Sequence, residues 1–185
     1  AYNNNGNAFA DKNDNKMALK MYNKAIKLSP GHAHTHINVG NLHQKIGHLE
    51  EAIRHYNQAM LCDPNNVEVF ACAAETYERW NKINELSNLL DKAKRQFQPF
   101  PNSLQIYLAL MNFRQQNFEE ALKILLAVKR NSISKKRLVF YFNLLGRCYE
   151  KLSKFENAYK SFHKMNLHHR ETKDFKLCKP DAFLS

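Results

Sequence analysis

The sequence lacks the features that mark several classes of protein. Its 185 residues contain no run of about 18 apolar residues, so we expect no membrane-spanning helix. The first ten residues are polar and rich in asparagine, so we expect no secretory signal either. Four cysteines without a C-x-x-C pair disfavour a disulfide framework and fit a reducing, cytoplasmic setting. We expect Cys62, Cys72 and Cys148 to be small buried side chains.

Signatures of catalysis and of metal binding are also missing. No Gly-rich phosphate loop, H-E-x-x-H segment or G-x-S-x-G segment occurs, so we expect neither a catalytic site nor a cofactor in these residues. Among nine histidines, His32, His34 and His36 lie near the start of a predicted helix, but no cysteine or carboxylate stands at ligand spacing beside them. We therefore interpret them as helix-surface residues and predict no metal site.

Glycine and proline are scarce, with five of each, and their positions indicate a repeat. The residues that recur at an offset of 34 positions are Gly6 and Gly40, Ala18 and Ala52, Tyr22 and Tyr56, Ala25 and Ala59, and Pro30 and Pro64. A fixed period of this length is typical of a repeat array. Apolar residues at intervals of three and four predict amphipathic helices, and no strand pattern competes with them.

The second copy of the repeat carries the pattern most completely, and it resembles the tetratricopeptide repeat (TPR). The residues that match the TPR pattern are Gly40, Ala52, Tyr56, Ala59 and Pro64, whereas His36, Val39 and His43 depart from it. The resemblance implies an all-α fold, an α-solenoid in which antiparallel helix pairs form a right-handed superhelix. We expect Gly40 to face Ala52 and Ala59 where the two helices cross, and Tyr56 to fill the space toward the next repeat.

The resemblance covers about residues 1–166 and predicts about five repeats. Their expected boundaries are 1–32, 33–66, 67–101, 102–138 and 139–166, and residues 167–185 are expected to form a capping helix and a tail. The first repeat is truncated at its start, the third is degenerate, and three extra residues fall between the fourth and the fifth. The basic segment Lys129–Arg137 lies at this insertion, and we interpret it as a solvated loop between repeats.

The resemblance also implies a function, because TPR arrays hold a peptide or a helix in a concave groove lined by the first helix of each pair. The positions that the family pattern assigns to this groove include Asn38, Asn41, Lys45, Arg79, Phe113, Arg114, Phe140, Asn143, Arg147 and Lys151. The later ones combine arginine and lysine with aromatic rings, which favours an acidic peptide or a C-terminal carboxylate. A chaperone-binding carboxylate clamp is disfavoured, because Glu68 and Cys72 stand in two of its basic positions.

The sequence therefore predicts a protein-interaction scaffold without enzymatic activity, and two alternatives remain open. The first is a regulatory or substrate-docking region of a larger transferase, since sulfotransferases and glycosyltransferases carry such arrays at their N-termini. The second is RNA binding, because 28 Lys and Arg against 17 Asp and Glu give a net charge of +11. No aromatic residues alternate with the basic segment, which disfavours stacking of single-stranded nucleic acid.

Overall fold

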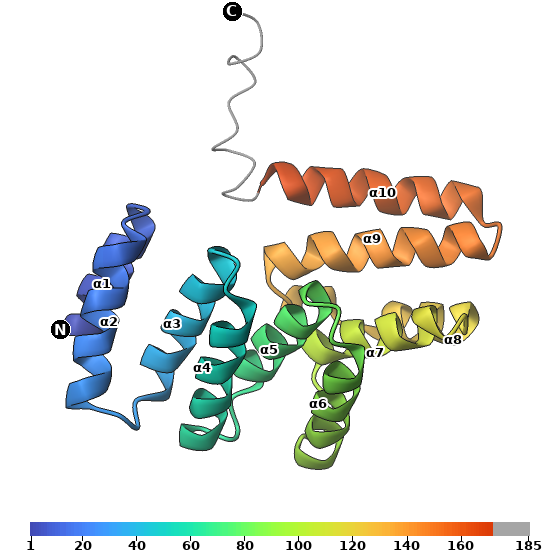
Figure 1. Cartoon of the computed structure of the whole chain (residues 1–185). Helices are drawn as coiled ribbons and strands as arrows, with labels where there is room; N and C mark the ends of the chain where they lie inside the picture. The colour runs from blue at the N-terminus through green and yellow to red at the C-terminus, as the bar shows by residue number, and fades with distance from the viewer. Residues whose placement is uncertain (172–185) are drawn as a thin grey trace, which may run out of the picture. The chain divides into compact units, whose positions relative to one another are not determined.

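The computed structural model describes residues 1–171, which belong to two compact units. Unit 1 is Ala1–Pro99, and unit 2 begins at Phe100. Within the described residues the regular structure consists of ten α-helices and one short 3-10 helix, without a strand, so the all-α prediction is confirmed (Figure 1). In this part of the chain no helix has both the length and the apolar character needed to cross a membrane.

Unit 1 consists of three helix pairs. The helices are α1 (Tyr2–Asp11), α2 (Asn15–Leu28), α3 (Ala33–Lys45), α4 (Leu49–Cys62), α5 (Val67–Arg79) and α6 (Ile83–Gln96). Each helix packs against the next one along the chain, and α3 also contacts α1 and α5 (Figure 1). We call the odd-numbered helices first helices and the even-numbered ones second helices. The first helices of unit 1 therefore share one face of the unit.

Unit 2 consists of two helix pairs, and some of their helices differ in length from those of unit 1. Its helices are α7 (Asn102–Arg114), α8 (Phe118–Ala127), α9 (Lys135–Lys151) and α10 (Phe155–Arg170), with a 3-10 turn at Arg130–Ser132. Figure 1 shows α9 and α10 side by side, and α9 also contacts α7 and α8. Helix α8 has 10 residues, whereas α2, α4 and α6 have 14 each. The second helix of this repeat, α8, therefore ends about one turn earlier than those of unit 1.

The expected loop over residues 129–137 is wrong for its last three residues. Helix α9 begins at Lys135, because the Ser134 hydroxyl caps it by accepting a hydrogen bond from the Arg137 backbone N–H at 3.4 Å. Arg137 is buried, with only 5% of its surface exposed. At the other end of the unit, α10 continues to Arg170, so it includes the first residues of the expected cap. Residues 172–185 of that cap and tail lie outside the described residues.

The turn inside each repeat has the same backbone geometry. One residue per turn has a positive φ, between 56° and 87°, and these residues are Asn13, Gly47, Asn81, Gln116 and Ser153. The next N–H donates to a carbonyl five residues back, as His48 does to His43 at 2.9 Å. This pattern is the Schellman motif, which satisfies carbonyl groups at the end of a helix. Backbone hydrogen bonds therefore close all five turns.

Three glycines of the first helices lie directly beneath an aromatic ring of the following second helix. The pairs are Gly6 with Tyr22, Gly40 with Tyr56, and Gly146 with Phe162. A Cβ atom added to Gly40 or to Gly146 would lie 2.5 Å from the Cε1 atom of the facing ring. The absence of a side chain is what allows the two helices to approach this closely.

This contact identifies the nearest neighbour of Gly40 in the second repeat. The three nearest atoms to a Cβ on Gly40 all belong to Tyr56, and none belongs to Ala52 or Ala59. Tyr56 is fully buried and covers the glycine of its own repeat. Ala52 and Ala59 are also fully buried, so the small residues serve the core as a group.

The described cysteines differ in their surroundings. Cys72 and Cys148 are buried, as expected, whereas Cys62 at the end of α4 is exposed, and its predicted burial is wrong. Burial raises the pKa of the Cys148 thiol to about 11, although the nearby charge of Arg147 acts in the opposite direction. The Cys148 side chain is therefore protonated near neutral pH and acts as a small apolar group.

Candidate functional site

The predicted groove residue Asn38 takes part in a hydrogen-bonded cluster that joins two first helices of unit 1. Its amide nitrogen donates to the Oδ1 atoms of Asn3 at 3.1 Å and of Asn7 at 2.9 Å. The Asn7 oxygen also accepts a hydrogen bond from the Tyr22 hydroxyl at 2.8 Å. These hydrogen bonds are made within the protein, and Asn38 links α1 and α3.

Two basic residues predicted for the groove in unit 1 also contact neighbouring repeats. The Lys45 ammonium group donates to Asn13 Oδ1 at 2.6 Å, and the Arg79 guanidinium group donates to the backbone carbonyl of Gln44 at 3.3 Å. The Gln44 side chain in turn donates to the Thr76 hydroxyl at 2.8 Å and is buried. The first-helix face of unit 1 is therefore bound together by polar side chains that connect successive repeats.

In unit 2 the corresponding contacts are aromatic. Phe140 stacks on Tyr107 with 5.7 Å between ring centroids, which connects α9 to α7. Phe113 packs edge-to-face against Phe118 with 5.2 Å between centroids, and the Arg147 guanidinium group lies 4.7 Å from the Phe113 centroid. A guanidinium group over an aromatic face is attracted by the negative face of the ring.

The burial of Phe113 changes its expected role. Only 8% of its surface is exposed, so the side chain cannot supply the apolar contact area that the sequence suggested. It instead provides a flat support for Arg147, which is exposed. The stack restricts the long arginine side chain. Less conformational entropy of this side chain is therefore lost when a ligand binds.

Arg147 stands where the first two repeats of unit 1 have asparagine, Asn7 and Asn41. Asn41 follows Gly40 and accepts a hydrogen bond from the Tyr56 hydroxyl at 2.8 Å, whereas Arg147 follows Gly146, which faces Phe162. Phenylalanine has no hydroxyl group that would need an acceptor. The sequence contains this difference as a change from tyrosine to phenylalanine at one repeat position. Only the contacts show that the residue after the glycine then no longer serves as the acceptor for a tyrosine hydroxyl.

The remaining predicted residues of unit 2 differ in exposure. Lys151 and Arg114 are exposed, whereas Asn143 is half-buried and its amide nitrogen lies 3.4 Å from the Met165 sulfur atom. No ion pair between described residues involves Arg147 or Lys151. One turn of helix separates these two cations, so both project from the same side of α9.

His32 and His34 are exposed, as expected, whereas His36 packs against another histidine, His55. His36 is buried, which corrects its surface assignment; its Nε2 atom lies 3.0 Å from the Pro30 carbonyl oxygen and its Nδ1 atom 3.2 Å from His55 Nδ1. Burial, followed by the charges of His36 and His43, lowers the pKa of His55 to about 4. Across residues 1–171, no group of three or more His, Cys, Asp or Glu is arranged to hold a metal ion.

Comparisons with known sequences identify the repeat in unit 1. A family model described as "TPR repeat" matches residues 6–47, and one described as "Tetratricopeptide repeat" matches residues 33–66. A curated relative, the "TPR repeat-containing protein YpiA" of Bacillus subtilis (strain 168), is 24% identical over 160 residues. The match covers 86% of this chain but only 37% of the relative, so the chain spans little more than a third of that protein's length.

Solved structures with the same fold extend the likeness to almost the whole chain. The crystal structure of the MamA protein matches with a TM-score of 0.63 and 18% identity, covering 96% of this chain and 95% of that one. YrrB, described as a TPR protein with an unusual peptide-binding site, matches with a TM-score of 0.61 and 18% identity over 90% of this chain and 84% of that one. The Cut9–Hcn1 complex matches with a TM-score of 0.77 and 16% identity, covering 90% of this chain and 32% of that one.

Proposed function

Because the chain belongs to the tetratricopeptide-repeat family, we propose that it is a protein-interaction scaffold that binds an acidic peptide on the first-helix face of unit 2. The observation that carries the proposal is the exposed guanidinium group of Arg147, which lies 4.7 Å above the ring of the buried Phe113. The structurally similar YrrB is described as having a peptide-binding site, and we extend peptide binding to this chain as part of the proposal.

The chemistry of this face fits a carboxylate. A guanidinium group presents paired N–H donors that match the two oxygens of a carboxylate, and its stack on Phe113 holds the plane of these donors in place. Lys151, one turn further along α9, adds a second exposed positive charge. The net charge of +11 favours encounter with an acidic partner through long-range attraction.

Unit 1 offers a contrast that supports placing the peptide on unit 2. Its basic first-helix residues, Lys45 and Arg79, already donate hydrogen bonds to Asn13 and to the Gln44 carbonyl. A carboxylate bound there would have to replace these contacts, so part of the binding free energy would be lost.

The test is to measure binding of a fluorescein-labelled peptide of Asp and Glu with a free C-terminal carboxylate, by fluorescence anisotropy on the full chain. Arg147→Ala combined with Lys151→Ala is expected to weaken binding by about tenfold or more, since each bond to a charged group contributes about 1.5–3 kcal/mol. The melting temperature should change little, because both side chains are exposed.

The matched control is Lys45→Ala combined with Arg79→Ala in unit 1, which also removes one lysine and one arginine charge. This variant is expected to bind the peptide within about twofold of the unaltered protein, as expected for a small non-specific contribution of net charge. Equal affinity in the Arg147 and Lys151 variant, with a loss in the control, would place the peptide elsewhere.

A further inference from the structure

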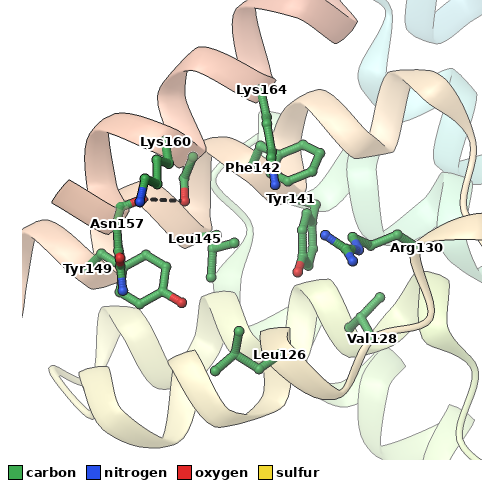
Figure 2. A pocket seen from close by; sticks show the side chains of 11 residues that line it. Leu126, Val128, Arg130, Tyr141, Phe142, Leu145, Tyr149, Asn157, Lys160 and Lys164 are labelled. Atoms are coloured by element: carbon green, nitrogen blue, oxygen red, sulfur yellow. Dashed lines mark hydrogen bonds between the residues drawn. The ribbon is translucent and has the colours of Figure 1, made fainter. Parts of the chain in front are cut away.

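A pocket of about 290 Å³ lies between α8, α9 and α10 within unit 2 (Figure 2). Its floor comes from α9, where Tyr141, Phe142 and Leu145 are almost fully buried. Leu126 and Val128 form one wall, and Asn157, Lys160, Ser161 and Lys164 of α10 form the other, while Arg130 and Tyr149 complete the lining. In Figure 2 Arg130 lies beside Tyr141, and Lys164 extends over Phe142.

The early end of α8 accounts for this pocket. Second helices in unit 1 have 14 residues, but α8 ends after 10, at Ala127, and the chain then turns away through Arg130–Ser132. The last turn of a full-length helix is therefore missing next to Leu126 and Val128, which line the pocket. Leu126 keeps 59% of its surface exposed, so an apolar side chain at the edge of the buried floor is accessible to a ligand.

The lining combines an apolar floor with a polar, positively charged edge. The Tyr141 hydroxyl donates to the Leu125 carbonyl at 3.1 Å, and the Ser161 hydroxyl donates to the Asn157 carbonyl at 2.8 Å, so both are satisfied within the protein. Lys164 Nζ lies 6.0 Å from the Phe142 ring centroid. Lys160, Lys164 and Arg130 supply three cations, and no carboxylate belongs to the lining.

We propose that this pocket is a second interaction site, which binds an acidic protein segment by accepting one of its large apolar side chains. The apolar floor provides area for a phenylalanine or leucine side chain, and the three cations match carboxylates on either side of it. Glu156 already pairs with Lys160, so Arg130 and Lys164 carry most of the complementary charge. An apolar anchor in a pocket with a charged edge is typical of the energetically dominant residues of protein interfaces.

This inference does not rest on the proposed function of the first-helix face. Leu145 and Tyr149, which line the pocket, are each two residues from Arg147, and two residues along an α-helix point roughly 200° apart. The pocket and the Arg147 side chain therefore lie on opposite sides of α9. A ligand at one site leaves the other accessible, so each can fail in a test without the other.

The experiment compares two fluorescein-labelled probes on the full chain: a short Asp and Glu peptide with one central phenylalanine, and the same peptide with glycine in its place. The phenylalanine probe is expected to bind at least about tenfold more tightly, because the ring leaves water for the apolar floor. Equal affinity of the two probes, or no binding of either, would overturn the proposal.

Two variants then locate the preference for phenylalanine. Leu126→Glu places a negative charge at an exposed position of the wall, and Lys160→Glu with Lys164→Glu reverses the charge of the α10 edge. Both are expected to reduce the ratio of the two affinities to about one, since like charges then oppose the probe. If the phenylalanine preference survives in the Leu126 variant, the ring binds elsewhere and the proposal is wrong.

Matched controls separate this site from general charge effects and from the first-helix face. Lys12→Glu with Lys16→Glu changes the net charge by the same amount at exposed positions of unit 1, and it should keep the phenylalanine preference. Arg147→Ala with Lys151→Ala should also keep the preference, although it weakens both probes if the first-helix face binds acidic peptides. Loss of the preference in these controls alone would contradict the assignment.

Discussion

Tyr56 and Phe162 occupy the same place in their repeats, over Gly40 and over Gly146, but only the tyrosine carries a hydroxyl group. In unit 1 this hydroxyl donates to Asn41, so a residue on the first-helix face serves the fold. In unit 2 the position of the asparagine is Arg147, which stacks on an aromatic ring instead. The hydroxyl group on the second helix thus occurs together with an acceptor on the first helix, and its absence occurs together with an arginine.

The two units also differ in how their first helices are joined. Unit 1 uses directional amide and hydroxyl hydrogen bonds, as between Asn38 and Asn7, whereas unit 2 uses aromatic contacts, as between Phe140 and Tyr107. Hydrogen bonds occupy donors and acceptors that would otherwise contact a ligand. A guanidinium group stacked on a ring keeps the N–H donors at its edge accessible. The same repeat geometry therefore yields a structural face in one unit and a candidate binding face in the other.

The largest expected effect tests what the two units share. Gly40→Leu is expected to destabilise the protein by about 3 kcal/mol, because even a Cβ atom would lie 2.5 Å from the buried Tyr56 ring. Gly146→Leu should have a similar effect against Phe162. Chemical denaturation followed by far-UV circular dichroism measures both, and Gly31→Leu is the control, since a Cβ there meets nothing within 4 Å. A Gly40 variant as stable as the unaltered protein would contradict the glycine–ring contact.

The glycine contact shows how far the sequence can predict this fold. A period of 34 residues was sufficient to predict paired helices, and the small residues correctly marked the close approach of each pair. Their partners could not be assigned, because Ala52, Tyr56 and Ala59 all lie on the buried side of one helix and only coordinates distinguish which one meets Gly40. Lys135 was likewise assigned to a loop, since helix α9 starts at a serine cap inside a basic segment.

The candidate site was predicted less well than the fold, for a related reason. Family positions place residues on the first helices, but they do not state what each side chain touches. The pattern predicted Lys45, Arg79 and Phe113 to line the groove together with Arg147. In the structure Lys45 and Arg79 bond to neighbouring repeats, and Phe113 is buried. The insertion between the fourth and fifth repeats marked the region where α8 ends, but the pocket beside it could not be predicted, because it depends on which side chains line the space.

An intermediate effect concerns the histidines of unit 1. The pKa of His55 is lowered to about 4, first by burial and then by the charges of His36, His43 and Arg54, while Glu51 acts in the opposite direction. In the unfolded chain this pKa returns to about 6.5, so between these values the unfolded state binds one more proton. The stability contributed by neutral His55 is present above pH 6.5 and is lost as the pH falls toward 4.

Unit 1 should therefore lose about 1–2 kcal/mol between neutral pH and pH 4, less than the full shift implies because solvent screens the half-exposed side chain. Trp80, the single tryptophan, lies in unit 1 and reports its unfolding by fluorescence. His55→Phe keeps a ring without a proton to bind, and it should flatten the pH dependence over this range. An unchanged slope in this variant would assign the acid sensitivity to other groups.

The smallest effect tests the difference between the units directly. Phe162→Tyr adds a hydroxyl group at the position where Tyr56 meets Asn41 in the second repeat. The oxygen can accept a hydrogen bond from Arg147, but Arg147 offers the hydroxyl proton no acceptor, so the variant should lose about 1 kcal/mol. Adding Arg147→Asn supplies an acceptor like that of Asn41 and should restore most of the loss. A double-mutant cycle from denaturation midpoints measures this coupling. Purely additive effects would mean that the hydroxyl does not select residue 147.

The five turns closed by backbone hydrogen bonds carry a consequence for how such a chain diverges. Because their left-handed residues include asparagine, glycine, glutamine and serine, the hairpin angle does not depend on one side chain. Mutations can then alter the exposed positions of α3 or α9 without changing the direction in which the chain returns. Neighbouring repeats are thereby free to acquire unrelated ligands during evolution while the helix pairs that carry them remain superimposable.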